Sequence, residues 1–293
     1  MAVTSWIRLC FSSYLSLYGL ATAFVVPYHE QQFLQAPFTK EQSSLEPAPN
    51  SVAGDCPRNS KLVKDGTLID QLWRANCDLV NKFLNNTFSV FQAISSDAVA
   101  FDSFQYYSVQ DYYYLVQTAQ HKAFLLPTIA PTDSELAAQI NETTESMIKD
   151  LGYASDFREI LHDTFNVSDA VIDSNTLEAA GLGYVKWLQE NTNLGWFAFQ
   201  VSRIPCIYGW AELAYILDSL PNVNKSTIFY REWINANMGW DYGDKMSKRF
   251  EDSLKLFNNS ETFPLYNRLF RQGLRFEIAF FESAMGKSLK DTA

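Results

Sequence analysis

Apolar residues recur at helical spacing over most of the chain. From residue 67 onward they follow one another at intervals of three or four: Leu68, Leu72, Ala75, Leu79 and Phe83. This spacing places them on one face of an α-helix, which a globular protein buries against its core. Similar patterns continue almost to the C-terminus, and no segment shows convincing strand-like alternation bounded by turn residues. The pattern therefore predicts an all-α fold.

Caps and helix breakers set the expected helix boundaries. One helix is expected from about Asp97 to Leu126, because Pro127 cannot continue it. Thr132 and Glu135 form a capping box that opens the next helix. Further helices are expected over residues 155–165, 174–190, 195–220, 226–237, 243–257 and 263–286. The prediction is a bundle of about eight helices within residues 66–293, with sites built from side chains on facing helices.

The N-terminal 65 residues do not share this pattern. Arg8 precedes a short apolar run, and Ala21-Thr22-Ala23 matches an A-x-A cleavage site, which together predict a secretory signal peptide over residues 1–23. The alternative is a membrane anchor, but the run is interrupted by serines and too short to span about 30 Å of hydrocarbon. Residues 24–65 are rich in proline, glutamine and serine, and are expected to form an extended arm.

Sequons and cysteines fit a secreted protein without a membrane anchor after cleavage. Five N-x-[ST] sequons predict glycosylation, at Asn85, Asn141, Asn166, Asn224 and Asn258. The mature chain keeps Cys56, Cys77 and Cys206. In an oxidising compartment this odd number implies either one disulfide and one free thiol or three free thiols. Because Cys56 and Cys77 are close in sequence, we expect a bond between them and a free Cys206.

The composition and motifs of the chain argue against several classes of function. The chain is 47% hydrophobic and 19% charged, as in globular proteins that bury a large core. Its net charge of −10 lacks the basic surface of a nucleic-acid-binding protein. No glycine-rich phosphate motif is present. The three histidines and a single Glu-x-x-His are too few for a di-iron bundle, so neither a metal nor a cofactor is expected.

Two segments place reactive groups in helical, aromatic surroundings. Asp111 and Tyr114 are spaced i, i+3 on one helix face, where a carboxylate can hold an exocyclic amine beside a stacking ring. The alternative is an aromatic face packed in the core, with Asp111 capping or solvated. Pro205 leaves nearby N–H groups unbonded, so the pKa of Cys206 can be lowered and its thiol can act as a nucleophile. The alternative is an inert buried cysteine.

Glu277 forms a third candidate. It lies within the aromatic run Phe276 to Phe281, where burial would raise the pKa of its carboxyl and make it a proton donor. The alternative is a salt bridge with Arg271 or Arg275 at the helix surface.

The sequence motifs around Asp111, Cys206 and Glu277, together with a fourth motif, resemble those of the TenA family (thiaminase II, also called aminopyrimidine aminohydrolase). The four are Y-x-x-Q-D-x-Y-Y-L at residues 107–115, P-C at the start of 205–210, Y-x-x-W-I at 230–234 and F-E-x-x-F-F at 276–281. Each string alone is weak, but their order and spacing are specific. The resemblance covers about residues 66–288 and implies the haem-oxygenase-like helical fold.

The resemblance also implies roles for individual residues. Cys206 would add to an aminopyrimidine ring, Glu277 would manage ring protonation, and Asp111 would hold the ring amine. These three would line one cavity. Its walls and binding contacts would come from aromatic residues: Tyr107, Tyr114, Trp210 and Phe281. No cofactor is implied, and the ligand would be thiamin or a related aminopyrimidine.

Several features depart from the family pattern. Trp210 replaces a tyrosine, which would remove any hydrogen bond or proton relay through its hydroxyl. Asn237 replaces another tyrosine and removes a stacking face unless Trp240 or Tyr242 supplies one. Family members are usually cytosolic and serve thiamin salvage, whereas this chain has the features of a secreted protein. Because they are often tetrameric, a homo-oligomer is one expectation.

Two functional hypotheses follow. The first is a secreted hydrolase of thiamin or a thiamin-derived aminopyrimidine. The second is a protein of specialised metabolism that binds an aromatic ligand on the same scaffold without hydrolysing it. Oxidase chemistry like that of the PqqC relatives would need more histidines.

We predict cleavage after Ala23 and release of a glycosylated protein, because the signal-peptide layout and the sequons agree. N-terminal sequencing and glycosidase treatment of the protein from a eukaryotic secretory host test this. An intact N-terminus on an unglycosylated cytosolic protein would contradict it.

Overall fold

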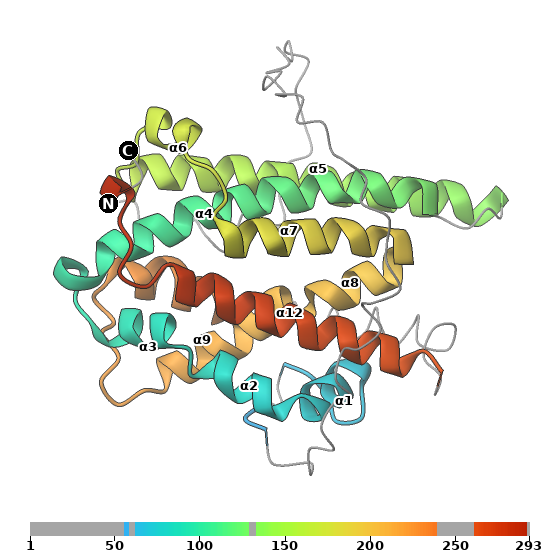
Figure 1. The fold of residues 1–293 in the computed structure, drawn as a ribbon, viewed down its shortest axis with the longest axis horizontal. Helices are drawn as coiled ribbons and strands as arrows, with labels where there is room; N and C mark the ends of the chain where they lie inside the picture. The colour runs from blue at the N-terminus through green and yellow to red at the C-terminus, as the bar shows by residue number, and fades with distance from the viewer. Residues whose placement is uncertain (1–55, 59–61, 129–132, 239–260, 292–293) are drawn as a thin grey trace. The chain divides into compact units, whose positions relative to one another are not determined.

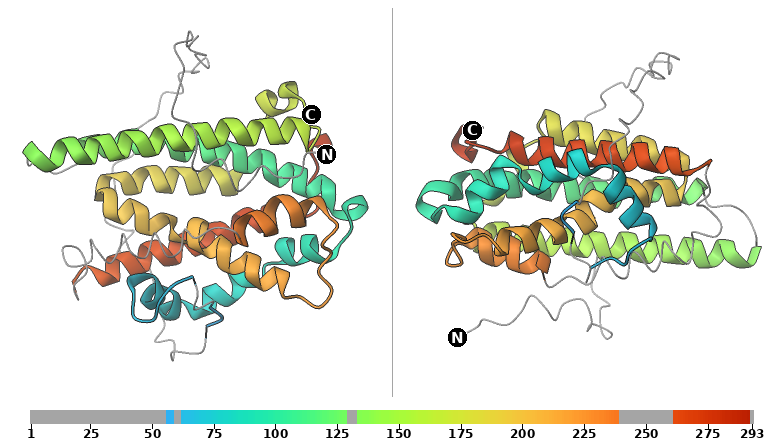
Figure 2. Two further views of the ribbon diagram at one scale, coloured as in Figure 1. Left: turned by 180° about the vertical axis from the view of Figure 1, so that it is seen from behind. Right: turned by 90° about the horizontal axis from the view of Figure 1, so that it is seen from below.

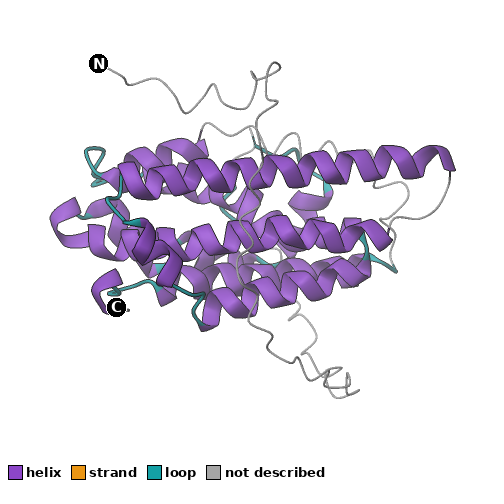
Figure 3. Ribbon diagram, turned by 90° about the horizontal axis from the view of Figure 1, so that it is seen from above, coloured by secondary structure: helices purple, strands orange, loops and turns teal. Residues whose placement is uncertain are grey.

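The computed structural model describes residues 56–58, 62–128, 133–238 and 261–291. These residues belong to one compact unit, residues 51–293. The expected signal peptide and most of the expected arm lie outside the described residues, as does the helix expected at 243–257. Within the described ranges the chain forms helices and no strand (Figure 3), which confirms the all-α prediction.

The N-terminal part of the bundle is broken where one helix was expected. It consists of α1 (Leu68–Ala75), α2 (Cys77–Leu84) and α3 (Thr87–Ile94). Between α1 and α2, the buried Asn76 amide donates to Leu72 O at 2.8 Å and to Asn267 Oδ1 at 2.6 Å. Before α3, Asn86 Oδ1 accepts from Ser89 N at 2.8 Å. Asparagine side chains compete for backbone groups, so the helix breaks while its apolar residues stay buried.

Long helices form the middle of the unit. The helix α4 (Asp97–Leu125) packs along α5 (Asp133–Asp163) and α7 (Ala179–Asn191) (Figure 1). The expected end of α4 before Pro127 is confirmed. Two helices were expected where the structure has the single helix α5. A glycine within a helix lowers its stability by only about 1 kcal/mol, so Gly152 does not end α5. A short helix, α6 (Asp169–Ser174), was not expected.

The segment expected as one helix over 195–220 contains a change of helix type. It runs through α8 (Trp196–Ile204), the π-helical turn η4 (Pro205–Gly209) and α9 (Trp210–Asp218). Pro205 has no N–H to donate, which disturbs the regular α-helical ladder at this point. A second π-helical turn, η5 (Tyr230–Ile234), leads into α10 (Asn235–Met238). The described 3₁₀ turns are η2 (Leu126–Thr128), η3 (Thr192–Leu194) and η6 (Leu289–Asp291).

The C-terminal helix α12 (Phe263–Ser283) contacts α8, η4, α7 and α2 (Figure 2). A Cβ atom at Gly273 would lie 2.9 Å from Ser202 O and 3.0 Å from Pro205 Cγ. Only glycine therefore allows α12 to approach α8 and η4 this closely. The approach places the C-terminal half of α12 beside η4.

A disulfide holds residues 56–58 to the helices. The Cys56 and Cys77 sulfur atoms are bonded at 2.03 Å, and Cys206 is free and buried. Nearby, the indole of Trp73 donates to Pro57 O at 2.9 Å. Arg58 Nε lies 3.2 Å from Asp70 Oδ1, and both side chains are almost fully buried.

The sequons differ in accessibility. Asn85, Asn141 and Asn166 are exposed, whereas Asn224 is half-buried and donates from Nδ2 to Ser95 O at 3.1 Å. A glycan on Asn224 would be attached to the nitrogen that donates this hydrogen bond. Asn258 lies outside the described residues. No helix among the described residues is both long enough and apolar enough to cross a membrane.

Replacing both Cys56 and Cys77 by alanine should lower the free energy of unfolding by on the order of 3 kcal/mol, because the disulfide closes a loop of about 20 residues. Urea denaturation measures this, and wild-type protein under reducing agent is the matched control. Peptide mapping that placed Cys206 in a disulfide would contradict the assignment.

Candidate active site

Five polar or ionisable side chains from four elements meet within the aromatic core. We call Asp111 and Tyr114 on α4, Tyr184 on α7, Cys206 on η4 and Glu277 on α12 the polar cluster. Asp111 is 4% exposed, Cys206 8% and Glu277 1%. The charge of Glu277 acts on Asp111, Tyr114, Tyr184 and Cys206. The structure therefore brings together the three candidates that the sequence separates by up to 166 positions (277 − 111).

Both oxygens of Glu277 accept hydrogen bonds. Tyr184 Oη donates to Oε1 at 2.7 Å, and Trp210 Nε1 donates to Oε2 at 2.9 Å. Burial raises the pKa of Glu277 to about 7, although the two donors oppose this shift by stabilising the carboxylate. The alternative of a surface salt bridge is wrong. Arg271 lies 2.7 Å from Asp78, and Arg275 donates to Gln272.

Asp111 is a buried carboxyl with an unused acceptor. Its Oδ1 atom has no hydrogen-bond partner among the described residues. Burial raises its pKa well above the usual range, and the negative charge of Glu277 raises it further. Leaving such an oxygen unpaired costs about 1–3 kcal/mol, so the atom is suited to a ligand that brings a donor. The alternative that Asp111 is solvated is wrong.

Cys206 lies in the π-helical turn η4, one residue after Pro205. Sequence reasoning suggested a lowered thiol pKa at this position. Instead, burial raises the pKa of Cys206, and the charge of Glu277 adds to the increase. Tyr114 and the positive charge of Arg203 oppose the shift without cancelling it. A thiolate here must therefore be formed by a neighbouring base.

Aromatic rings surround these groups. Tyr107 stacks on Phe281 with centroids 5.2 Å apart, and Tyr114 lies 4.9 Å from Tyr184. Trp210 lies 6.3 Å from Phe281. Three further polar atoms are buried without a hydrogen-bond partner of regular geometry: Tyr107 Oη, Tyr114 Oη and Trp233 Nε1. Trp233 Nε1 still interacts with the Tyr107 hydroxyl, and the Tyr114 hydroxyl with the Cys206 thiol. Polar atoms with such imperfect pairing around a thiol and two carboxyls are typical of a ligand site.

The two departures from the family pattern have different consequences. The hydrogen bond expected to be lost at Trp210 is present, because the indole N–H reaches Glu277. An indole accepts no hydrogen bond, so the expected loss of a proton relay through this position stands. Asn237 is buried and donates from Nδ2 to Trp233 O at 2.8 Å. Trp240 and Tyr242, considered as replacements for the stacking face, lie outside the described residues.

Sequence reasoning missed Tyr184 and assigned no role to Trp233. Tyr184 belongs to none of the strings that carried the family resemblance. A buried Glu277 requires a donor, but the sequence does not indicate which helix supplies it. Trp233 lies in the string at 230–234, and its ring stacks on Phe229 at 5.4 Å. The indole N–H of Trp233 interacts with the Tyr107 hydroxyl.

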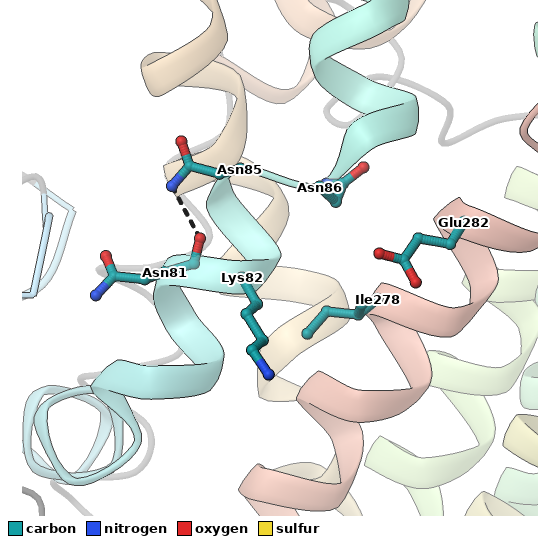
Figure 4. A pocket seen from close by; sticks show the side chains of 6 residues that line it. All are labelled: Asn81, Lys82, Asn85, Asn86, Ile278 and Glu282. Atoms are coloured by element: carbon teal, nitrogen blue, oxygen red, sulfur yellow. Dashed lines mark hydrogen bonds between the residues drawn. The ribbon is translucent and has the colours of Figure 1, made fainter.

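A surface hollow of about 610 Å³ lies elsewhere, between α2 and α12 (Figure 4). It is lined by Asn81, Lys82, Asn85, Asn86, Ile278 and Glu282. None of these belongs to the polar cluster, so this hollow is not the cavity expected around Asp111, Cys206 and Glu277. Among the described side chains, no group of three or more histidine, cysteine or acidic residues could hold a metal ion.

Comparisons with known proteins identify similar folds and the family of the chain. The fold is similar to the TenA homologue from P. horikoshii OT3, with a TM-score of 0.60 and 17% identity over 74% of this chain and 98% of that one. It is also similar to a putative TenA-like thiaminase from Sulfolobus solfataricus P2, with a TM-score of 0.56 and 20% identity over 75% and 97%.

A TenA homologue from Pyrococcus furiosus gives a TM-score of 0.60 and 19% identity, over 74% of this chain and 99% of that one. No curated protein sequence matches the chain. The family model described as TENA/THI-4/PQQC matches residues 90–287, which include the whole polar cluster. The chain therefore belongs to the TENA/THI-4/PQQC family.

Proposed function

We propose that the protein is a secreted TenA-type hydrolase of thiamin or a thiamin-derived aminopyrimidine. The observation that carries this proposal is the meeting of Asp111, Cys206 and Glu277 in one buried, ring-lined cluster. A putative TenA-like thiaminase among the similar structures supports the same reaction class. Secretion rests on the sequence features of residues 1–23 and on the sequons.

Asp111 is suited to recognise the amidine edge of a 4-aminopyrimidine. Burial raises the pKa of Asp111, which favours the protonated carboxyl, and in that form it has one O–H donor and one C=O acceptor. The amidine edge offers one ring-nitrogen acceptor and one amine donor, so two hydrogen bonds form together. Tyr107 and Tyr114, on the same helix as Asp111, provide ring faces for stacking.

In this proposal Cys206 is the nucleophile, and Glu277 is the base and then the acid. The Cys206 thiol loses its proton to the Glu277 carboxylate, and the thiolate adds to a carbon of the ring. Glu277 returns the proton to a ring nitrogen, which accepts the electron pair. For thiamin, the electron pair of that nitrogen expels the neutral thiazole from the methylene group on the ring. Water then adds to the methylene and gives a proton to the Glu277 carboxylate. Departure of the Cys206 sulfur, which takes back the proton of the ring nitrogen, restores the aromatic ring. A pKa of about 7 allows Glu277 to take up and release a proton near neutral pH.

A second candidate is a protein that binds the same ligand without turnover. The raised pKa of Cys206 favours this candidate, because it reduces the amount of thiolate. Asn237, where the family has a tyrosine, also changes the surroundings of Trp233. Incubation with thiamin and aminopyrimidines distinguishes the two: free pyrimidine or ammonia indicates the hydrolase, and binding without either product indicates the binding protein.

Replacing Cys206 by serine should abolish hydrolysis and leave ligand affinity nearly unchanged. Glu277→Gln should lower kcat by about 10²–10³ and change KM less than threefold, because it removes proton transfer and keeps the shape. Steady-state kinetics and calorimetric binding measure both effects. Glu212→Gln is the matched control, since Glu212 is a buried glutamate outside the polar cluster. Full activity of Cys206→Ser would leave only the binding protein.

Glu277 should also make stability depend on pH. Its folded pKa of about 7 lies above the unfolded value of 4.5, so its stabilising effect is present below pH 4.5 and lost as pH rises towards 7. Between pH 4.5 and 7 the wild type should lose roughly 3 kcal/mol relative to Glu277→Gln. Urea denaturation over this range tests the expectation. Parallel pH profiles for the two proteins would show that Glu277 is not buried.

A further inference from the structure

The π-helical turn η4, which carries Cys206, needs support from neighbouring elements. It departs from the regular α-helical hydrogen-bond ladder, and Pro205 supplies no N–H to it. Contacts with other elements therefore help to fix its position. At the start of η4, Pro205 packs against Gly273 of α12, where a Cβ atom would lie 3.0 Å from the proline Cγ. The contacts at the end of the turn then decide how firmly the thiol between them is placed.

Trp73 of α1 packs on the end of η4. Its ring centroid lies 5.0 Å from that of Tyr208, edge to face at 71°, and both side chains are completely buried. A Cβ atom at Gly209 would lie 3.1 Å from Phe83 Cε1 and 3.8 Å from Trp73 Cζ3, so the backbone of η4 lies directly against α1 and α2. Trp73 thus supports the last two residues of the turn.

The position of Trp73 depends in turn on residues 56–58, which we call the strap. The Trp73 indole N–H donates to Pro57 O at 2.9 Å. A buried indole N–H needs an acceptor, and the strap supplies one. Directly before Pro57, Cys56 forms the disulfide with Cys77, the first residue of α2. The strap therefore fastens the indole of α1 to the start of α2.

An ion pair attaches the strap to α1 a second time. Arg58 Nε lies 3.2 Å from Asp70 Oδ1, and their side chains are only 7% and 5% exposed. Asp70 lies one turn before Trp73 on the same helix, so the pair fixes the turn that carries the indole. Breaking a buried ion pair leaves an uncompensated charge, which makes this attachment hard to release.

We propose that Trp73 is a positioning residue for the Cys206 thiol, and that the Cys56–Cys77 disulfide holds Trp73 in place through the strap. The contacts form a continuous line from the disulfide to Pro57 O, the indole and the ring of Tyr208, two residues after Cys206. The effect on catalysis rests on the hydrolase proposed above. The effect on the position of the thiol does not.

Release of the strap should make the thiol more accessible and less well placed. Without support at its end, η4 admits water and small reagents to Cys206. Because burial raises the pKa of this thiol, water entry also increases the fraction of thiolate. The side chains that interact with the thiol are unchanged in the variants used below: Glu277, Tyr114, Arg203 and Asp111. Binding through Asp111 on α4 should persist, because α4 is not part of the line of contacts.

The test measures how fast iodoacetamide alkylates Cys206, identified by peptide mass spectrometry. Two variants release the strap differently: Cys56→Ala with Cys77→Ala removes the disulfide, and Trp73→Phe keeps a ring but loses the N–H that reaches Pro57 O. Both should be alkylated about tenfold faster than the wild type at pH 7.5, a pH at about which thiols are partly ionised. With an aminopyrimidine substrate, kcat should fall about tenfold and KM should change less than threefold, because the nucleophile is displaced and the binding groups are not.

The matched control is Ile172→Ala, a truncation of a fully buried side chain on α6. Such a change causes a comparable loss of stability without touching the line of contacts. It should keep the wild-type kcat and an alkylation rate within about twofold of the wild type. Circular dichroism should show that each variant is folded. If Ile172→Ala reacts as fast as the disulfide variant, the thiol is exposed by general loss of stability, and the positioning role is wrong.

The positioning role and the proposed function can fail separately. A wild-type alkylation rate in Trp73→Phe, or in the variant without the disulfide, would overturn the positioning role whatever the activity. A wild-type protein that hydrolyses neither thiamin nor any aminopyrimidine would overturn the hydrolase alone, because alkylation requires no substrate. Faster alkylation in both variants with wild-type kcat would show that the thiol moves without consequence, and would overturn its positioning for catalysis.

Discussion

Burial of the Glu277 carboxyl is the constraint on which the arrangement of the site depends. A carboxyl that is 1% exposed must find donors within the protein, and here they come from two other elements. The donor atoms of Tyr184 on α7 and of Trp210, the first residue of α9, both lie within 3 Å of a Glu277 carboxyl oxygen. The close approach at Gly273, one turn earlier on α12, makes this possible. The packing that satisfies Glu277 also brings it to Cys206.

The π-helical turns add a second constraint, on the direction of side chains. Cys206 lies in η4 and Trp233 in η5, and both turns depart from the regular α-helical period beside the polar cluster. Such turns are common at functional sites, because they alter which side chains face inward. At η4 the cause is visible in the sequence, since Pro205 lacks an N–H. The turn η5 contains no proline, so the sequence carries no such signal there.

The sequence predicts a structural feature well when that feature depends on neighbouring residues, and poorly when it depends on tertiary packing. The long apolar pattern and Pro127 predict α4 well, and the periodicity of α12 predicts that helix. The breaks at Asn76 and Asn86 were missed because each depends on hydrogen bonds that do not change the apolar period. For the site, local sequence chemistry indicated Asp111, Cys206 and Glu277, and the motif resemblance gave each of them a role. It could not supply Tyr184, whose role depends only on the packing of α7 against α12, nor the direction of the thiol pKa, which depends on burial.

The central claim is that the polar cluster binds an aminopyrimidine through the carboxyl of Asp111. Calorimetric titration of the Cys206→Ser protein tests it most directly, with a 4-aminopyrimidine and with the same ring lacking its exocyclic amine. We expect one binding site for the amine-bearing ring and at least about tenfold weaker affinity for the other, because Asp111 then loses a hydrogen bond in a buried site. Equal affinities, or no binding of either ring, would contradict the claim.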